Sequence, residues 1–161
     1  MPDSSNLSTT TAQRYADMQL ALTGLLAGEA DLIANTANFA ALVYATLPDL
    51  NWAGFYFLRG SELVLGPFQG RPACVRIAVG RGVCGMAVAR CASIRVPDVH
   101  AFPDHIACDR ASRSELVVPL LRGDTVVGVF DLDSPSLNRF SEEDQRGIEA
   151  AVGLLLAACR F

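Results

Sequence analysis

Cys108 lies in a polar stretch of the chain, His105-Ile106-Ala107-Cys108-Asp109, where packing gives no reason for a thiol. His105 and Asp109 flank it, and seven residues further on Glu115 opens a run that is otherwise apolar. The thiolate is the reactive form of cysteine, and nearby charges and dipoles set how much of it is present. We therefore take Cys108 as a candidate nucleophile or redox centre, with His105 as one source of activation.

Glu115 is predicted to begin a β-hairpin that spans residues 115–133. The run alternates apolar residues around an Arg-Gly-Asp turn, which is typical of two paired strands. If Leu121 pairs with Thr125 across the turn, Glu115 lies opposite Asp131. This register predicts that two carboxyl groups face each other.

Asp133 joins this pair because residues two apart in a strand share a face. Like charges are not placed together for stability, so Glu115, Asp131 and Asp133 indicate a site. Crowded carboxyl groups can bind a cation such as an ammonium, and they raise one another's pKa, so that one can act as a general acid. Solvated acids at a strand end are the alternative interpretation. The same charges would oppose formation of a thiolate at Cys108.

The composition excludes several classes of function. The net charge is -4, which argues against a nucleic-acid-binding protein. All 13 basic residues are Arg, so no Schiff-base or P-loop lysine exists. No secretory signal and no apolar run of roughly 18 residues is found, so we expect no membrane segment. Five cysteines, an odd number, without a signal indicate a reducing, cytoplasmic location.

Cys84 lies in Gly80-Arg81-Gly82-Val83-Cys84-Gly85, which matches a dinucleotide-binding pattern. Its context disagrees, because such a site needs βαβ units and antiparallel hairpins are predicted here. We interpret the glycines as a tight turn that presents Cys84 at a helix start, where a thiolate is favoured. Zinc ligation by cysteines 74, 84 and 108 with His105 is disfavoured by the spacing, so no metal is expected. Cys91 and Cys159 are interpreted as structural.

The predicted elements form an α+β domain built on an antiparallel sheet. Residues 1–11 are expected to be a disordered tail, and residues 12–161 a single domain. Trp52 and Tyr56 share one face of the first strand. The elements read from periodicity and breaker residues are helices near 15–26 and 31–47, strands at 51–58, 62–68 and 74–79, a helix at 82–90, a strand at 93–96, a loop at 99–114, the hairpin, and a helix from 141.

Taken together, these motifs closely resemble the free methionine-(R)-sulfoxide reductases, a family of GAF-domain enzymes. The resemblance covers nearly all of the chain after the tail, and the spacing of three cysteines is its specific part. It departs at Asp104, where the family usually has Gly. The matching stretches are Asn51-Trp52-Ala53-Gly54-Phe55-Tyr56, Leu65-Gly66-Pro67-Phe68-Gln69-Gly70 through Pro72-Ala73-Cys74, Gly80 to Gly85, Val96-Pro97-Asp98-Val99, His105 to Asp109, Ser114 to Pro119, and Gly128 to Ser134.

The resemblance implies a GAF fold and a role for each matching residue. Cys108 matches the catalytic cysteine, Cys84 the main resolving cysteine and Cys74 an additional one. Trp52 and Tyr56 match an aromatic pocket wall. The acidic substrate-binding residues are matched by Glu115, Asp131 and Asp133.

The resemblance also implies a reaction, in which free L-methionine-(R)-S-oxide is reduced to methionine. Cys108 would become a sulfenic acid and then a disulfide, which thioredoxin would reopen; no bound cofactor is needed. A homodimer is expected. The alternative is a non-catalytic GAF sensor of a small ligand with redox-active cysteines. We favour the enzyme because sensor domains are usually fused to an output domain.

Overall fold

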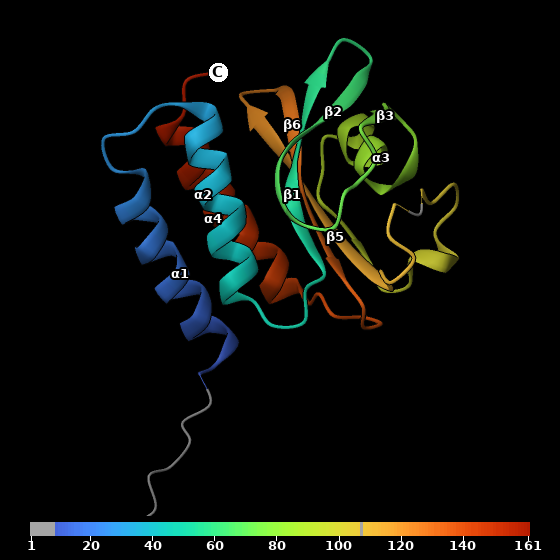
Figure 1. The fold of residues 1–161 in the computed structure, drawn as a ribbon, viewed down its shortest axis with the longest axis horizontal. Helices are drawn as coiled ribbons and strands as arrows, with labels where there is room; N and C mark the ends of the chain where they lie inside the picture. Colours follow the sequence, from blue (N-terminus) through green and yellow to red (C-terminus); the bar gives the residue numbers. More distant parts are fainter. Residues whose placement is uncertain (1–8, 107) are drawn as a thin grey trace, which may run out of the picture.

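A six-stranded antiparallel sheet organises the chain in the computed structural model, which describes residues 9–106 and 108–161 (Figure 1). The strand order is β3-β2-β1-β6-β5-β4, so the first hairpin lies next to the last one. The elements are α1 (Thr11–Leu26), α2 (Leu32–Thr46), β1 (Trp52–Arg59), β2 (Glu62–Gly70), β3 (Arg76–Ala78), α3 (Gly82–Arg90), β4 (Ile94–Val96), a 3-10 helix (Val99–Ala101), β5 (Ser114–Arg122), β6 (Thr125–Ser134) and α4 (Glu142–Ala158).

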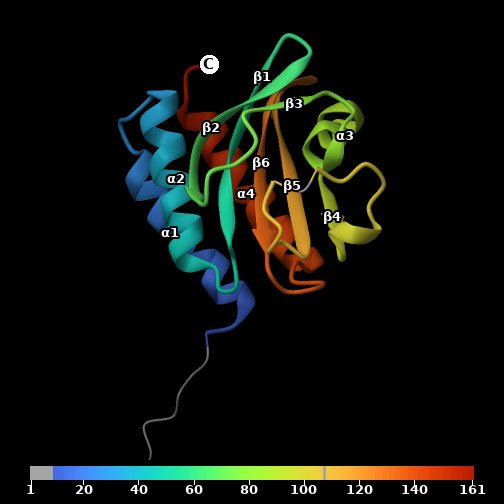
Figure 2. The same ribbon diagram turned by 45° about the vertical axis from the view of Figure 1, so that its right-hand side comes forward.

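Two layers cover the sheet, one on each face. Helices α1, α2 and α4 pack on one face, while α3 and the long connections lie on the other (Figures 1 and 2). Strand β1 contributes to both layers by alternation: Phe55 packs among the three helices, and Trp52 and Tyr56 face the α3 side. This confirms the predicted faces of β1 and places the two aromatic residues on the side of the cysteines.

The helix ends follow their capping residues. Thr10 and Asp31 accept hydrogen bonds from the first turns of α1 and α2, and Ser141 forms a capping box with Asp144. The predicted tail was one residue too long, because Thr11 already lies in α1; residues 1–8 of it fall outside the described residues. No helix in the described ranges has the length and apolar character to cross a bilayer.

The hairpin of β5 and β6 forms as predicted, but its register differs by two residues. The turn holds only two residues, so Arg122 pairs with Thr125, and an irregularity at Leu120 and Leu121 shifts the pairing once more. Glu115 therefore lies opposite Asp133 and not opposite Asp131. Because the shift is even, all three acids keep the predicted common face.

Candidate active site

A small, largely enclosed cavity lies between the sheet and α3, on the face opposite the three packed helices. Its volume is about 40 Å³, and its lining combines aromatic, acidic and sulfur-containing side chains. Every site residue predicted from the sequence is brought together here except Cys74, whose neighbours Pro72 and Ala73 line the wall. The predicted residues in the lining are Trp52, Tyr56, Cys84, His105, Cys108, Glu115, Asp131 and Asp133.

The three acids reach the cavity from neighbouring strands β5 and β6. Glu115 and Asp131 are each only 6% exposed, and Asp133 is partly buried. Burial, followed by the charges of the other acids, raises the pKa of all three carboxyl groups well above the usual range. The cavity therefore holds carboxyl groups that retain protons at a higher pH than solvated ones do.

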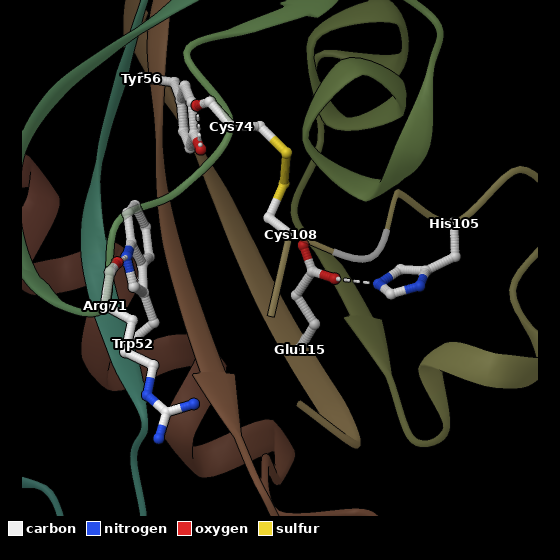
Figure 3. Close-up of a disulfide and its surroundings, with 7 residues drawn as sticks. All are labelled: Trp52, Tyr56, Arg71, Cys74, His105, Cys108 and Glu115. Carbon is white, nitrogen blue, oxygen red and sulfur yellow. Dashed lines mark hydrogen bonds and ion pairs between the residues drawn. A yellow bond between two sulfur atoms is a disulfide. The ribbon is translucent and has the colours of Figure 1, made fainter. Parts of the chain in front are cut away.

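His105 contacts Glu115, and its ring points toward the Glu115 carboxyl group, which lies beside Cys108 (Figure 3). Its Nε2 lies 3.7 Å from Glu115 Oε2, and burial lowers the pKa of the imidazole. A neutral imidazole next to a carboxyl group with a raised pKa is a polar contact and not a strong ion pair. His105 is thus placed to orient Glu115.

Cys108 is joined to Cys74 by a disulfide (Figure 3). Their Cα atoms are 5.5 Å apart, although the residues are separated by 34 positions in the sequence. Cys74 lies in the connection between β2 and β3, and Cys108 in the connection before β5. The partner of Cys108 therefore differs from Cys84, which the resemblance implied as the main resolving cysteine.

Cys84 is a buried free thiol in the first turn of α3. The glycine-rich turn presents it there as predicted, with Gly80 and Gly82 at positive φ. The predicted stabilisation of a thiolate is wrong, because burial and then Asp131, Glu115 and Asp133 raise the pKa of the thiol. Ligand atoms of Cys84, Glu115 and Asp131 all lie within 4.8 Å of one another, so the three groups face one point.

The aromatic wall consists of two stacked rings on β1. The ring centroids of Trp52 and Tyr56 are 5.8 Å apart. Their polar atoms are directed at the β2–β3 connection: Trp52 Nε1 donates to the carbonyl oxygen of Arg71 at 3.1 Å, and the Tyr56 hydroxyl donates to that of Cys74 at 2.9 Å. Phe68 stacks on the Trp52 ring at 5.3 Å, and both Trp52 and Tyr56 line the cavity.

Asn51 is a site residue that the sequence reasoning missed. Its Nδ2 donates to Asp109 Oδ2 at 3.2 Å and to Ser112 Oγ at 3.0 Å, while Asp109 Oδ1 accepts from the backbone of Ala111. These bonds tie the connection that follows Cys108 to the start of β1. Its position directly before Trp52, a predicted site residue, is the feature of the sequence that could have identified Asn51.

The remaining singled-out residues lie away from the cavity. Cys159 is buried and accepts a hydrogen bond from Asn35, whereas Cys91 is exposed at the end of α3. Asp104 has a φ of 57°, a left-handed conformation that glycine adopts most easily and aspartate tolerates. This is a physical reason for the Gly that the resemblance implies there.

Comparisons with known proteins agree with this arrangement. The GAF domain model matches residues 34–158. The free methionine-R-sulfoxide reductase of Escherichia coli is 53% identical over 141 residues, which is 88% of this chain and 86% of that protein. A protein of the same name from Saccharomyces cerevisiae is 40% identical, over 88% of this chain and 83% of that one.

Solved structures show the same likeness. The free methionine-R-sulfoxide reductase of Neisseria meningitidis in complex with its substrate has a TM-score of 0.88 and 42% identity, covering 92% of this chain and 89% of that one. The reduced form of the Staphylococcus aureus fRMsr has a TM-score of 0.87 and 44% identity, covering 89% and 94%. The sequence identity, its extent and the cysteine-bearing cavity place this GAF-domain chain in the free methionine-R-sulfoxide reductase family.

Proposed function

We propose that this protein reduces free L-methionine-(R)-S-oxide to L-methionine with the thiol of Cys108. The observation that carries the proposal is a disulfide that links Cys108 to Cys74 at the edge of a cavity lined by buried acids and stacked aromatic rings. The names of the bacterial and yeast relatives support the substrate.

The cavity has one apolar and one acidic side, which suits methionine sulfoxide. Trp52 and Tyr56 offer an apolar surface to the S-methyl group. The acids can bind the ammonium, and Asp131 Oδ1 supports this because it is buried and accepts no hydrogen bond from the described part of the chain. A peptide-bound methionine has an amide in place of the ammonium, so the acids select the free amino acid.

The first step transfers oxygen from the substrate to the enzyme. The Cys108 thiolate attacks the sulfoxide sulfur, a carboxylic acid protonates the sulfoxide oxygen, and methionine leaves with Cys108 as a sulfenic acid. Glu115 is the best placed donor, because its pKa is raised and His105 orients its carboxyl group. The substrate sulfur gains the two electrons that Cys108 loses.

The second step forms the disulfide and releases water. The Cys74 thiol attacks the Cys108 sulfenic sulfur, its proton leaves with the sulfenic oxygen, and a Cys74–Cys108 bond results. A dithiol reductant of the thioredoxin class then reopens this bond by exchange and is itself oxidised to a disulfide. Cys84 is the weaker candidate for resolution, because its buried thiol is held protonated among acids.

The disulfide form is closed to substrate. A volume of about 40 Å³ is far below the roughly 300 Å³ or more of pockets that bind small molecules. Reduction frees Cys108 from Cys74 and lets the two connections separate. Binding of substrate therefore follows reduction in each cycle.

The decisive experiment is consumption of free methionine-(R)-S-oxide by the purified protein with thioredoxin, thioredoxin reductase and NADPH. Wild type should reduce the R epimer, leave the S epimer, and leave the sulfoxide of an N-acetylated methionine. Cys108→Ser should abolish turnover, and Cys91→Ser, an exposed thiol outside the cavity, is the matched control. Retained turnover in Cys108→Ser would refute the assignment.

We also propose that the protein is a homodimer that works in the cytoplasm, where a thioredoxin system keeps thiols reduced. Leu20 of α1 and Ile33 of α2 support an interface, because they are 75% and 58% exposed. Light scattering after size exclusion tests the assembly. A monomeric mass at micromolar concentration would contradict it.

A further inference from the structure

The aromatic wall of the cavity is bonded to the segment that carries Cys74. The Tyr56 hydroxyl donates to the carbonyl oxygen of Cys74 itself, and Trp52 Nε1 donates to that of Arg71, three residues earlier. Figure 3 shows the Tyr56 hydroxyl directed at the backbone of Cys74, whose side chain extends away to Cys108. One rigid strand, β1, thus fixes two points of a segment without regular structure.

The course of the segment is further fixed where it leaves β2. Gly70 has a φ of +122°, and a Cβ there would lie 2.7 Å from the backbone oxygen of Asn51 and 2.7 Å from Trp52 Cδ1. The chain can approach β1 this closely only without a side chain. After Gly70, the next hydrogen bonds from β1 to the backbone of the segment come from the side chains of Trp52 and Tyr56. These two residues therefore direct the chain toward Cys108.

We propose that Tyr56 is a positioning residue for disulfide formation: its hydrogen bond to the Cys74 carbonyl holds the Cys74 thiol within reach of the Cys108 sulfur. This inference rests on the proposed function for its place in the catalytic cycle. The bond-forming step is unchanged: the Cys74 sulfur displaces the sulfenic oxygen from Cys108, and water leaves.

The physical reason is the entropy of closing a ring between two connections. Cys74 and Cys108 lie in separate connections, and a thiol on a loose segment samples many positions that cannot react. Tyr56 is 1% exposed, so its hydroxyl occupies a fixed position. Burial, with the neighbouring acids and Cys84, raises the pKa of this hydroxyl, so it stays protonated and donates across the working pH range.

The test is the Tyr56→Phe variant, which removes one oxygen and keeps the ring. Its Cys74–Cys108 disulfide is equilibrated with reduced and oxidised glutathione in the absence of any sulfoxide. We expect the equilibrium constant for disulfide formation to fall about fivefold, the effect of one lost hydrogen bond. Tyr15→Phe is the matched control, because it removes the buried hydroxyl that donates to Asp144 on the opposite face of the sheet; its equilibrium should equal that of wild type.

A second measurement follows the cycle itself. After one addition of methionine-(R)-S-oxide, the Cys108 sulfenic acid is trapped with dimedone and expressed per methionine released, which removes any effect on substrate binding. Tyr56→Phe should give several times more trapped sulfenic acid than wild type. Trp52→Phe, which loses the bond to Arg71, should shift the glutathione equilibrium in the same direction and serves if Tyr56→Phe does not fold.

Two results would overturn the inference. One is a glutathione equilibrium in Tyr56→Phe within twofold of wild type. The other is an equal shift in Tyr15→Phe, which would indicate general loosening. Since the glutathione measurement needs no substrate, a wild type that releases no methionine would refute the proposed function and leave this result readable.

Discussion

The Cys74–Cys108 disulfide should make the thermal stability of the protein depend strongly on redox state. The bond closes a loop across 34 positions of sequence, from the β2–β3 connection to the segment before β5. Closing a loop of this length removes conformational entropy from the unfolded chain, which is worth about 4 kcal/mol at 25 °C in the chain-entropy description. For a domain of this size, 1 kcal/mol moves the Tm by roughly 2–4 °C.

Oxidised wild type should therefore unfold roughly 8–16 °C above the protein kept in a dithiol reductant. Differential scanning calorimetry with and without reductant measures this gap. Cys74→Ser should remove the gap and unfold like reduced wild type under both conditions. Cys91→Ser should keep the full gap, because Cys91 is an exposed free thiol.

The same series decides which cysteine pairs with Cys108. Loop entropy depends on the logarithm of loop length, so pairing with Cys84 would give a gap of nearly the same size. The variants separate the two pairings. If Cys84→Ser removes the gap and Cys74→Ser keeps it, the Cys74–Cys108 assignment is refuted, and the positioning role of Tyr56 is refuted with it.

Three further predictions concern the cavity. Burial raises the pKa of Glu115, so the folded protein holds this proton to a higher pH than the unfolded chain does. The bound proton stabilises the folded state fully below the pKa of the unfolded state, and this stabilisation is lost as the pH rises through the pKa of the folded state. Denaturant unfolding at pH 8 should therefore show Glu115→Gln more stable than wild type, by roughly 0.5–2 kcal/mol, with a smaller gain at pH 4. Calorimetric titration should detect methionine-(R)-S-oxide binding to reduced Cys108→Ser and none to the oxidised wild type, whose cavity is about 40 Å³. Asn51→Ala frees Asp109 and Ser112, so single-turnover release of methionine should slow about tenfold with little change in Tm, and an unchanged rate would contradict the anchoring role.

The sequence predicted the common face of the acids better than it predicted their pairing. Which face of the sheet a side chain occupies depends only on the alternation of side chains along its strand. The apolar residues of β5 and β6 indicate this alternation. The register also depends on the two-residue turn and on the irregularity at Leu120, which has no clear residue signature. Each effect moved the register by one residue, so the total shift was even, and the three acids kept their common face although the predicted pairing was wrong.

The choice of disulfide partner was beyond the sequence for a different reason. Cys74 and Cys84 both precede Cys108, and both lie beside turn-forming residues. The tertiary structure distinguishes the two cysteines. The path of the chain after Gly70 brings Cys74 to Cys108, whereas Cys84 is buried in α3 next to the acids. The spacing of residues in the sequence predicts neither the path of this segment nor the burial of Cys84.

The acids and the thiol of Cys108 are compatible because the acids are buried. Three charged carboxylates beside Cys108 would raise the pKa of its thiol and suppress the attacking thiolate. Burial and mutual repulsion raise the pKa of the carboxyl groups themselves, so the cavity carries less negative charge than the count of acids suggests. In the mechanism that we propose, Glu115 is protonated, opposes the thiolate little and supplies the proton that the sulfoxide oxygen needs. The same proposal has the substrate ammonium favour ionisation of the aspartates, so that binding and proton donation are assigned to different acids of the cluster.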